Sequence, residues 1–90
     1  MESKIKALIE KHYKTAKVFS VTVEPSALFK DDTCVYIQCS AGNNYPRIAQ
    51  RILNAYPDVR MVHFTGGWVE AVYTRETLRW AGYRIIDHKK

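Results

Sequence analysis

The side chains that could carry out acid–base chemistry are few in this sequence. Two β runs, Val59–Thr65 and Trp68–Thr74, flank Gly66-Gly67, a pair suited to a tight hairpin turn that would place His63 opposite Glu70. A carboxylate beside an imidazole favours the charged ring, which could serve a metal-independent ribonuclease. No acidic cluster, phosphate-cradling glycine loop or nucleophile motif accompanies this pair. The sequence therefore predicts a protein that is not an enzyme, with no cofactor and no metal, and ribonuclease activity is the third-ranked hypothesis.

The arginines form the second chemical pattern. The net charge is +5. All six arginines lie after residue 32, and this part of the chain carries a net charge of +4. Arg47 and Arg51 repeat at a four-residue spacing in one expected helix, and Arg75 and Arg79 do so in another. The planar guanidinium suits phosphate or carboxylate recognition, so these rows are expected to face a nucleic acid or another partner. The alternative is a solvated basic surface that maintains solubility.

Aromatic side chains form the third pattern. If the second and third strands are neighbours, Tyr36, His63 and Trp68 share the sheet face that points away from the helices. Exposed rings on a sheet can stack unpaired bases while arginines contact the phosphates. Alternatively, this face is covered by the last helix, by the loop with Leu28 and Phe29, or by a second copy of the chain.

The elements that position these residues follow from hydrophobic periodicity. Apolar residues at three- and four-residue spacing predict a helix capped by Ser3, a second with Pro46 in its first turn, and a third capped by Thr74 and ended by Gly82. Alternating patterns predict strands over 17–24 and 33–39, the two hairpin runs above, and a last edge strand over 83–87. In the first strand, Phe19, Val21 and Val23 are expected to share one face.

The expected fold is therefore α+β: a four to five stranded mixed or antiparallel sheet with helices packed on one face, in the order α-β-β-α-β-β-α with an optional final β. The chain is short enough for a single domain spanning residues 1–90. Two helix-strand-strand units offset by about 43 residues would be compatible with an internal duplication.

From residue 33 onward, the element order is similar to that of the RNA-recognition motif. The segment Val35-Tyr36-Ile37-Gln38 resembles its first-strand signature, and Gly67-Trp68 fits part of the signature on its third strand. Gly66 replaces the basic residue of that signature, and Glu70 stands in an aromatic position. The resemblance implies RNA binding on the sheet, although a carboxylate there would repel phosphates.

The remaining features predict a cytoplasmic location. The amino-terminal residues carry no apolar signal segment, and no apolar stretch approaches the roughly 20 residues that span a bilayer. Cys34 and Cys39 are separated by an odd number of positions in one strand, so they are expected to point to opposite faces as reduced thiols.

Together, these patterns predict a small basic binding module that acts stoichiometrically on a macromolecular partner, preferentially a nucleic acid or nucleoprotein complex. The alternative is a protein-binding inhibitor or adaptor of the kind that phage or plasmid accessory genes encode, and a homodimer paired through an edge strand is a further expectation. The candidate contact residues are Arg47, Arg51, Arg75, Arg79, Tyr36, Trp68 and His63.

Overall fold

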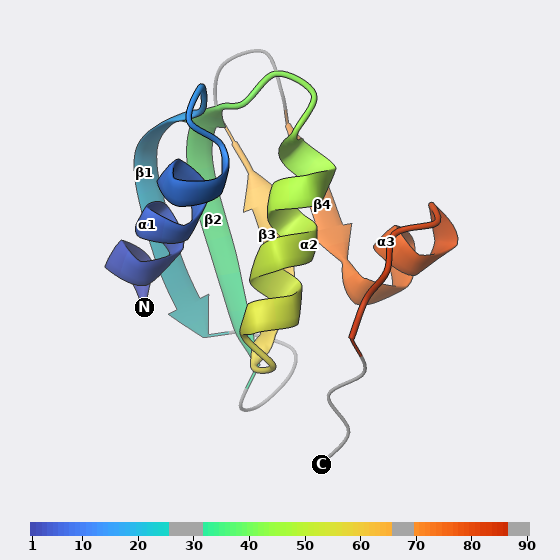
Figure 1. The fold of residues 1–90 in the computed structure, drawn as a ribbon. Helices are drawn as coiled ribbons and strands as arrows, with labels where there is room; N and C mark the ends of the chain where they lie inside the picture. Colours follow the sequence, from blue (N-terminus) through green and yellow to red (C-terminus); the bar gives the residue numbers. More distant parts are fainter. Residues whose placement is uncertain (26–31, 66–69, 87–90) are drawn as a thin grey trace.

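The computed structural model describes residues 1–25, 32–65 and 70–86. Over these ranges, helices and strands follow the expected order α-β-β-α-β-β-α (Figure 1). The elements are α1 (Glu2–His12), β1 (Lys17–Pro25), β2 (Thr33–Ser40), α2 (Tyr45–Ala55), β3 (Val59–Phe64), β4 (Ala71–Thr74) and α3 (Arg75–Trp80). The predicted small α+β fold with a mixed four-stranded sheet is confirmed.

The strands lie in the sheet in their chain order, β1-β2-β3-β4. The outer pairs are antiparallel, whereas β2 and β3 are parallel neighbours that α2 connects as a crossover. In the RNA-recognition motif, the two strands joined by the first helix are separated by another strand. The resemblance from residue 33 onward therefore stops at the order of the elements and does not extend to the topology.

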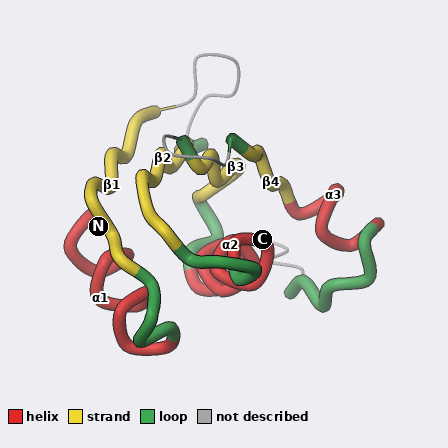
Figure 2. The backbone as a smooth tube through the Cα atoms, turned by 90° about the horizontal axis from the view of Figure 1, so that it is seen from above, coloured by secondary structure: helices red, strands yellow, loops and turns green. Residues whose placement is uncertain are grey.

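Two of the helices, α1 and α2, cover one side of the sheet. Seen from above, α1 and α2 lie on the same side, and α3 lies beside the β4 edge (Figure 2). On β2, the side chains of Val35, Ile37 and Cys39 are buried toward the helices, as predicted. The core comprises Ile5, Ile9, Ala16, Val35, Ile37, Cys39, Ala41, Ile48, Ala49, Ile52, Leu53, Val59, Val62, Phe64 and Leu78.

One face assignment on β1 was wrong. Val18 pairs with Cys39 and Ser20 pairs with Gln38, so Phe19 is an extra residue in β1, a β-bulge. The bulge turns Val18 toward the core together with Val21 and Val23, and it leaves Phe19 71% exposed. Alternation predicts that Phe19 shares a face with Val21 and Val23 because it takes no account of this irregularity.

The predicted register of the second hairpin was also wrong. His63 pairs with Val72 and Phe64 pairs with Ala71, a shift of two residues from the pairing that a two-residue turn would set. A shift by two keeps every side chain on its expected face, so Val62 and Phe64 are still buried. Gly66-Gly67 and Trp68 lie outside the described residues.

The predicted start of α2 and the predicted ends of α3 are confirmed, whereas the predicted N-cap of α1 was wrong. Pro46 lies in the first turn of α2, and Thr74 caps α3 by accepting a hydrogen bond from the Thr77 amide. Gly82 has φ +95°, and the Gly82 and Tyr83 amides donate to carbonyls of α3 in a Schellman motif. Ser3, however, lies inside α1, whose N-cap is Met1.

The expected edge strand after Gly82 is not formed over residues 83–86, which run back along α2 instead. Residue 87 and the loop with Leu28 and Phe29 lie outside the described residues. The helices of the described ranges include none with the length and apolar character needed to cross a membrane.

Candidate functional site

A groove of about 600 Å³ lies on the outer surface of the helix layer. Its volume is within the usual range of ligand sites. It is lined by side chains of α1, α2 and the segment after α3: Leu8, Tyr13, Arg47, Gln50, Arg51, Asn54, Ala55 and Tyr83. Arg47 and Arg51, the first arginine row predicted from the sequence, thus line one concave surface together.

The helical period of α2 explains why both arginines face outward. Ile48 and Ile52 belong to the stripe that α2 buries against the sheet, so Arg47 and Arg51 stand on the opposite, exposed side. The α2 sequence contains no aspartate or glutamate. Like charges four residues apart destabilise a helix by about 0.2–0.5 kcal/mol. An anion held between the two guanidinium groups would remove this repulsion.

Arg51 is held in place by Tyr13, the residue at the end of α1. The Arg51 Nε donates a hydrogen bond of 3.1 Å to the Tyr13 hydroxyl, and the guanidinium carbon lies 5.8 Å from the centre of the Tyr13 ring. Because Nε is engaged in this way, the two terminal amino groups of Arg51 have a defined orientation. A guanidinium group fixed by its Nε can still present these amino groups to a phosphate.

The electrostatic environment near this end of α1 is positive. The pKa of His12 is lowered from its ordinary value by loss of hydration, and then by the charges of Arg51 and Lys11. The imidazolium form is therefore disfavoured by the same charges that would attract an anion. His12 does not line the groove, but it shares the charge of Arg51 with it.

The segment that follows α3 contributes Tyr83 to the groove. The Arg84 carbonyl accepts hydrogen bonds from Gln50 Nε2 at 2.8 Å and from Asn54 Nδ2 at 3.2 Å. The Ile86 amide donates to Asn54 Oδ1 at 2.8 Å. Two side chains of α2 therefore fix the backbone on the carboxyl side of Tyr83. No local pattern in the sequence predicts these contacts of Asn54.

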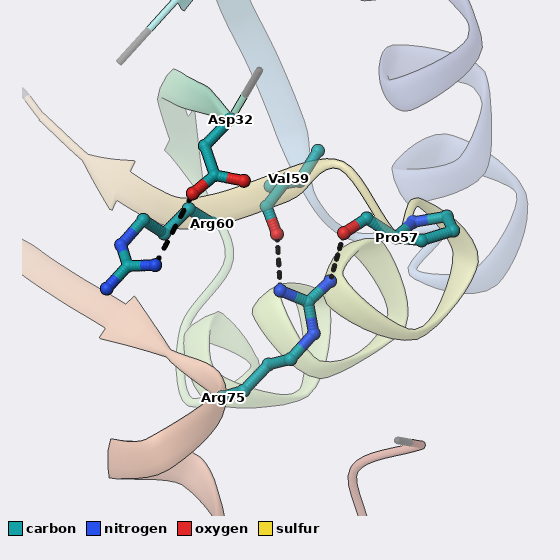
Figure 3. Close-up of polar contacts among 5 residues, drawn as sticks. All are labelled: Asp32, Pro57, Val59, Arg60 and Arg75. Carbon is teal, nitrogen blue, oxygen red and sulfur yellow. Dashed lines mark hydrogen bonds and ion pairs between the residues drawn. The ribbon is translucent and has the colours of Figure 1, made fainter. Parts of the chain in front are cut away.

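Arg75, from the second arginine row, points into the protein. Its guanidinium donates to the carbonyls of Val59 (2.6 Å), Leu53 (2.9 Å), Tyr56 (3.1 Å) and Pro57 (3.3 Å). Figure 3 shows the side chain spanning the gap between α3 and the turn from α2 to β3. Desolvation is the main cause that lowers the pKa of Arg75. These contacts tie α3 to the body of the fold.

Arg79 is exposed in the last turn of α3 and is not among the residues that line the groove. The two arginine rows therefore do not form one continuous surface. Another arginine, Arg60, forms an ion pair with Asp32, with 3.4 Å between the guanidinium nitrogen and the carboxylate oxygen (Figure 3).

Tyr36 and His63 lie on the other face of the sheet. Tyr36 and His63 are directly paired across β2 and β3, with ring centres 5.6 Å apart. His63 Nε2 lies 3.6 Å from Glu70 Oε1, beyond the usual reach of about 2.6–3.2 Å for a proton-transfer pair. Trp68 lies outside the described residues. Because successive side chains of a strand alternate faces, the sheet separates Tyr36 from the arginine groove.

Within the described ranges, no cluster of three or more His, Cys, Asp or Glu side chains is arranged to hold a metal ion. No protein-family model, curated protein or solved structure matches this chain at a significant level. Inference about function therefore depends on the groove.

Proposed function

We propose that this protein is a non-catalytic binding module that contacts the phosphate backbone of a nucleic acid, alone or within a nucleoprotein complex. The observation that carries the proposal is the pair Arg47 and Arg51 on one wall of the groove, where α2 supplies no carboxylate. Tyr13 orients one of the two guanidinium groups in advance. Such preorganisation reduces the entropy that binding would otherwise cost.

The charge of the whole protein supports a polyanionic partner. The net charge is +5 and the isoelectric point is about 9.4. A basic surface attracts nucleic acid over long range, and the contacts then release counterions from the phosphates. The groove therefore combines a local anion site with a favourable overall field.

The double charge reversal Arg47→Glu with Arg51→Glu tests this proposal. Retardation of a single-stranded oligonucleotide in a native gel is expected to be lost, because two attractive contacts become repulsive. The melting temperature should change little, since both side chains are exposed and contribute little to stability. Retardation equal to that of the wild type would overturn the proposal.

A matched control separates the groove from net charge. Lys4→Glu with Lys6→Glu changes the net charge by the same amount at two exposed positions of α1 that do not line the groove. This variant should lose less affinity than the α2 double variant. Equal losses in the two variants would show that binding follows overall charge rather than the groove.

A protein partner is the second candidate function. The side chains of Phe19 and Trp80 are 71% and 96% exposed, and large aromatic residues often carry the energy of protein interfaces. Salt distinguishes the two candidates. Phosphate binding weakens steeply between 50 and 200 mM salt, whereas an interface centred on aromatic residues responds little.

A further inference from the structure

The tyrosines that line the groove, Tyr13 and Tyr83, support a more specific inference, which rests on the proposed function. We propose that Tyr83 is a stacking platform for one unpaired base, so that the ligand is single-stranded nucleic acid, and that Asn54 is the positioning residue that holds this platform. The phosphates on either side of that base are then within reach of the arginine row.

Tyr83 is the better platform of the two tyrosines in the groove. The Tyr13 ring already has the Arg51 guanidinium over it and serves to orient that charge. The Tyr83 ring is half-buried, packs against the core cluster and also lines the groove. A ring supported by the core and facing a groove is suited to stack on a flat ligand.

The backbone around Tyr83 is fixed on both sides. On the amino side, Gly82 adopts φ +95° and the Tyr83 amide donates to the Leu78 carbonyl at 2.9 Å. On the carboxyl side, the Asn54 amide group binds both the Arg84 carbonyl and the Ile86 amide. The Asn54 side chain thus bonds to the backbone of Arg84 and Ile86 in the way that the backbone of a neighbouring strand would. A platform held in this way needs little ordering when the ligand binds.

Stacking also decides the class of ligand. A base inside a duplex has both faces covered by its neighbours, so a side chain can stack on it only when the base is unpaired. The arginine pair adds phosphate contacts that do not depend on sequence. Together, the groove should favour single strands over duplexes of equal length and show little preference among sequences.

The test is fluorescence anisotropy with a labelled oligothymidine, and with a labelled duplex of the same length, on the full chain. Tyr83→Phe should bind the single strand as the wild type does, because the ring remains. Tyr83→Ala should bind about 5- to 150-fold more weakly. The dependence on salt should keep its slope in both variants, because no phosphate contact is lost.

The role of Asn54 is tested by a double-mutant cycle. Asn54→Ala should weaken binding in the wild-type background with an unchanged salt slope, and it should have no further effect in the Tyr83→Ala background. A purely structural loss would add to that of Tyr83→Ala, and this result would overturn the positioning role. If Asn54→Ala does not fold, the comparison of Tyr83→Phe with Tyr83→Ala still decides the stacking claim.

The outcomes separate this inference from the proposed function. A wild-type protein that binds neither oligonucleotide would overturn both. A wild-type protein that binds, with Tyr83→Ala equal to Tyr83→Phe, would overturn the stacking platform and leave phosphate recognition by the arginines intact. Equal affinity for the single strand and the duplex would also overturn the inference.

Discussion

The Nε of Arg51 donates a 3.1 Å hydrogen bond to the hydroxyl of Tyr13, across 38 positions of the sequence. This contact joins the end of α1 to the exposed side of α2. It fixes the direction of a charge that would otherwise be free to rotate on a long side chain. The first prediction follows from this contact.

Tyr13→Phe should weaken binding to a single-stranded oligonucleotide about 2- to 10-fold, because Arg51 would then be ordered only when the ligand binds, and immobilising such a side chain costs about 0.5–1.5 kcal/mol. Anisotropy titrations at fixed salt measure the effect. Tyr56→Phe is the matched control, because Tyr56 also ends a helix but does not line the groove. Equal affinities for the two variants would contradict the orienting role of Tyr13.

Binding should raise the pKa of His12. In the free protein this pKa lies below 6.5, through loss of hydration and then the charges of Arg51 and Lys11. A phosphate beside Arg51 offsets that charge, so the complex takes up protons and its affinity increases as the pH falls through this range. NMR titration of the His12 ring, with and without oligonucleotide, measures the shift.

The same pKa has a consequence for the free protein. The folded chain disfavours the protonated form of His12. The part of the free energy of unfolding that depends on His12 is therefore present above pH 6.5, and it is lost as the pH falls through the lowered pKa of the folded state. Arg51→Gln is the control: it should raise the pKa of His12 in the free protein and reduce the change on binding. A ligand-induced shift of undiminished size in that variant would contradict the coupling.

Arg75→Ala should reduce the free energy of unfolding by about 2–4 kcal/mol, because it leaves four carbonyl acceptors without their donor. Arg75→Lys should recover little of this, since an ammonium group cannot form the same fork. Urea denaturation measures both. Arg79→Ala, exposed on the same helix, should stay within about 0.5 kcal/mol of the wild type, and a loss as large as that of Arg75→Ala would contradict the assignment.

The two cysteines should differ in reactivity. Burial raises the pKa of the Cys39 thiol to about 11, whereas Cys34 is half-buried. At pH 8, iodoacetamide should therefore modify Cys34 well before Cys39, since the thiolate is the reactive form. Mass spectrometry of partly modified protein measures the order. In denaturant the rates should converge, and a Cys39 that reacts first in the native protein would contradict the predicted order.

Local patterns predicted the elements well where one face of an element is buried. The buried stripe of Ile48 and Ile52 predicted α2 and the outward direction of Arg47. With 3.6 residues per turn, a helix that buries this stripe must turn Arg47 to its exposed side. Thr74 and Gly82 predicted the ends of α3, because the threonine hydroxyl accepts a hydrogen bond from a first-turn amide and glycine readily adopts a positive φ.

Other features depend on contacts between distant residues and could not be predicted in this way. Val18 and Phe19 are both apolar, so alternation alone could not show which of them the bulge exposes. The apolar residues Ile85 and Ile86 favoured a strand, but Asn54 side-chain contacts took its place. No pattern in the sequence brings Tyr13 and Tyr83 to one groove; the packing of α1, α2 and the segment after α3 does.

The contacts of Arg75 also bear on how the chain matures. The carbonyls of Leu53, Tyr56 and Pro57 lie 18 to 22 positions before the arginine that binds them. A nascent chain that ends before residue 75 lacks the donor for these oxygens, so the corner after α2 is complete only once Arg75 has been added. Short as it is, α3 thereby completes the hydrogen bonding of the turn that joins α2 to β3.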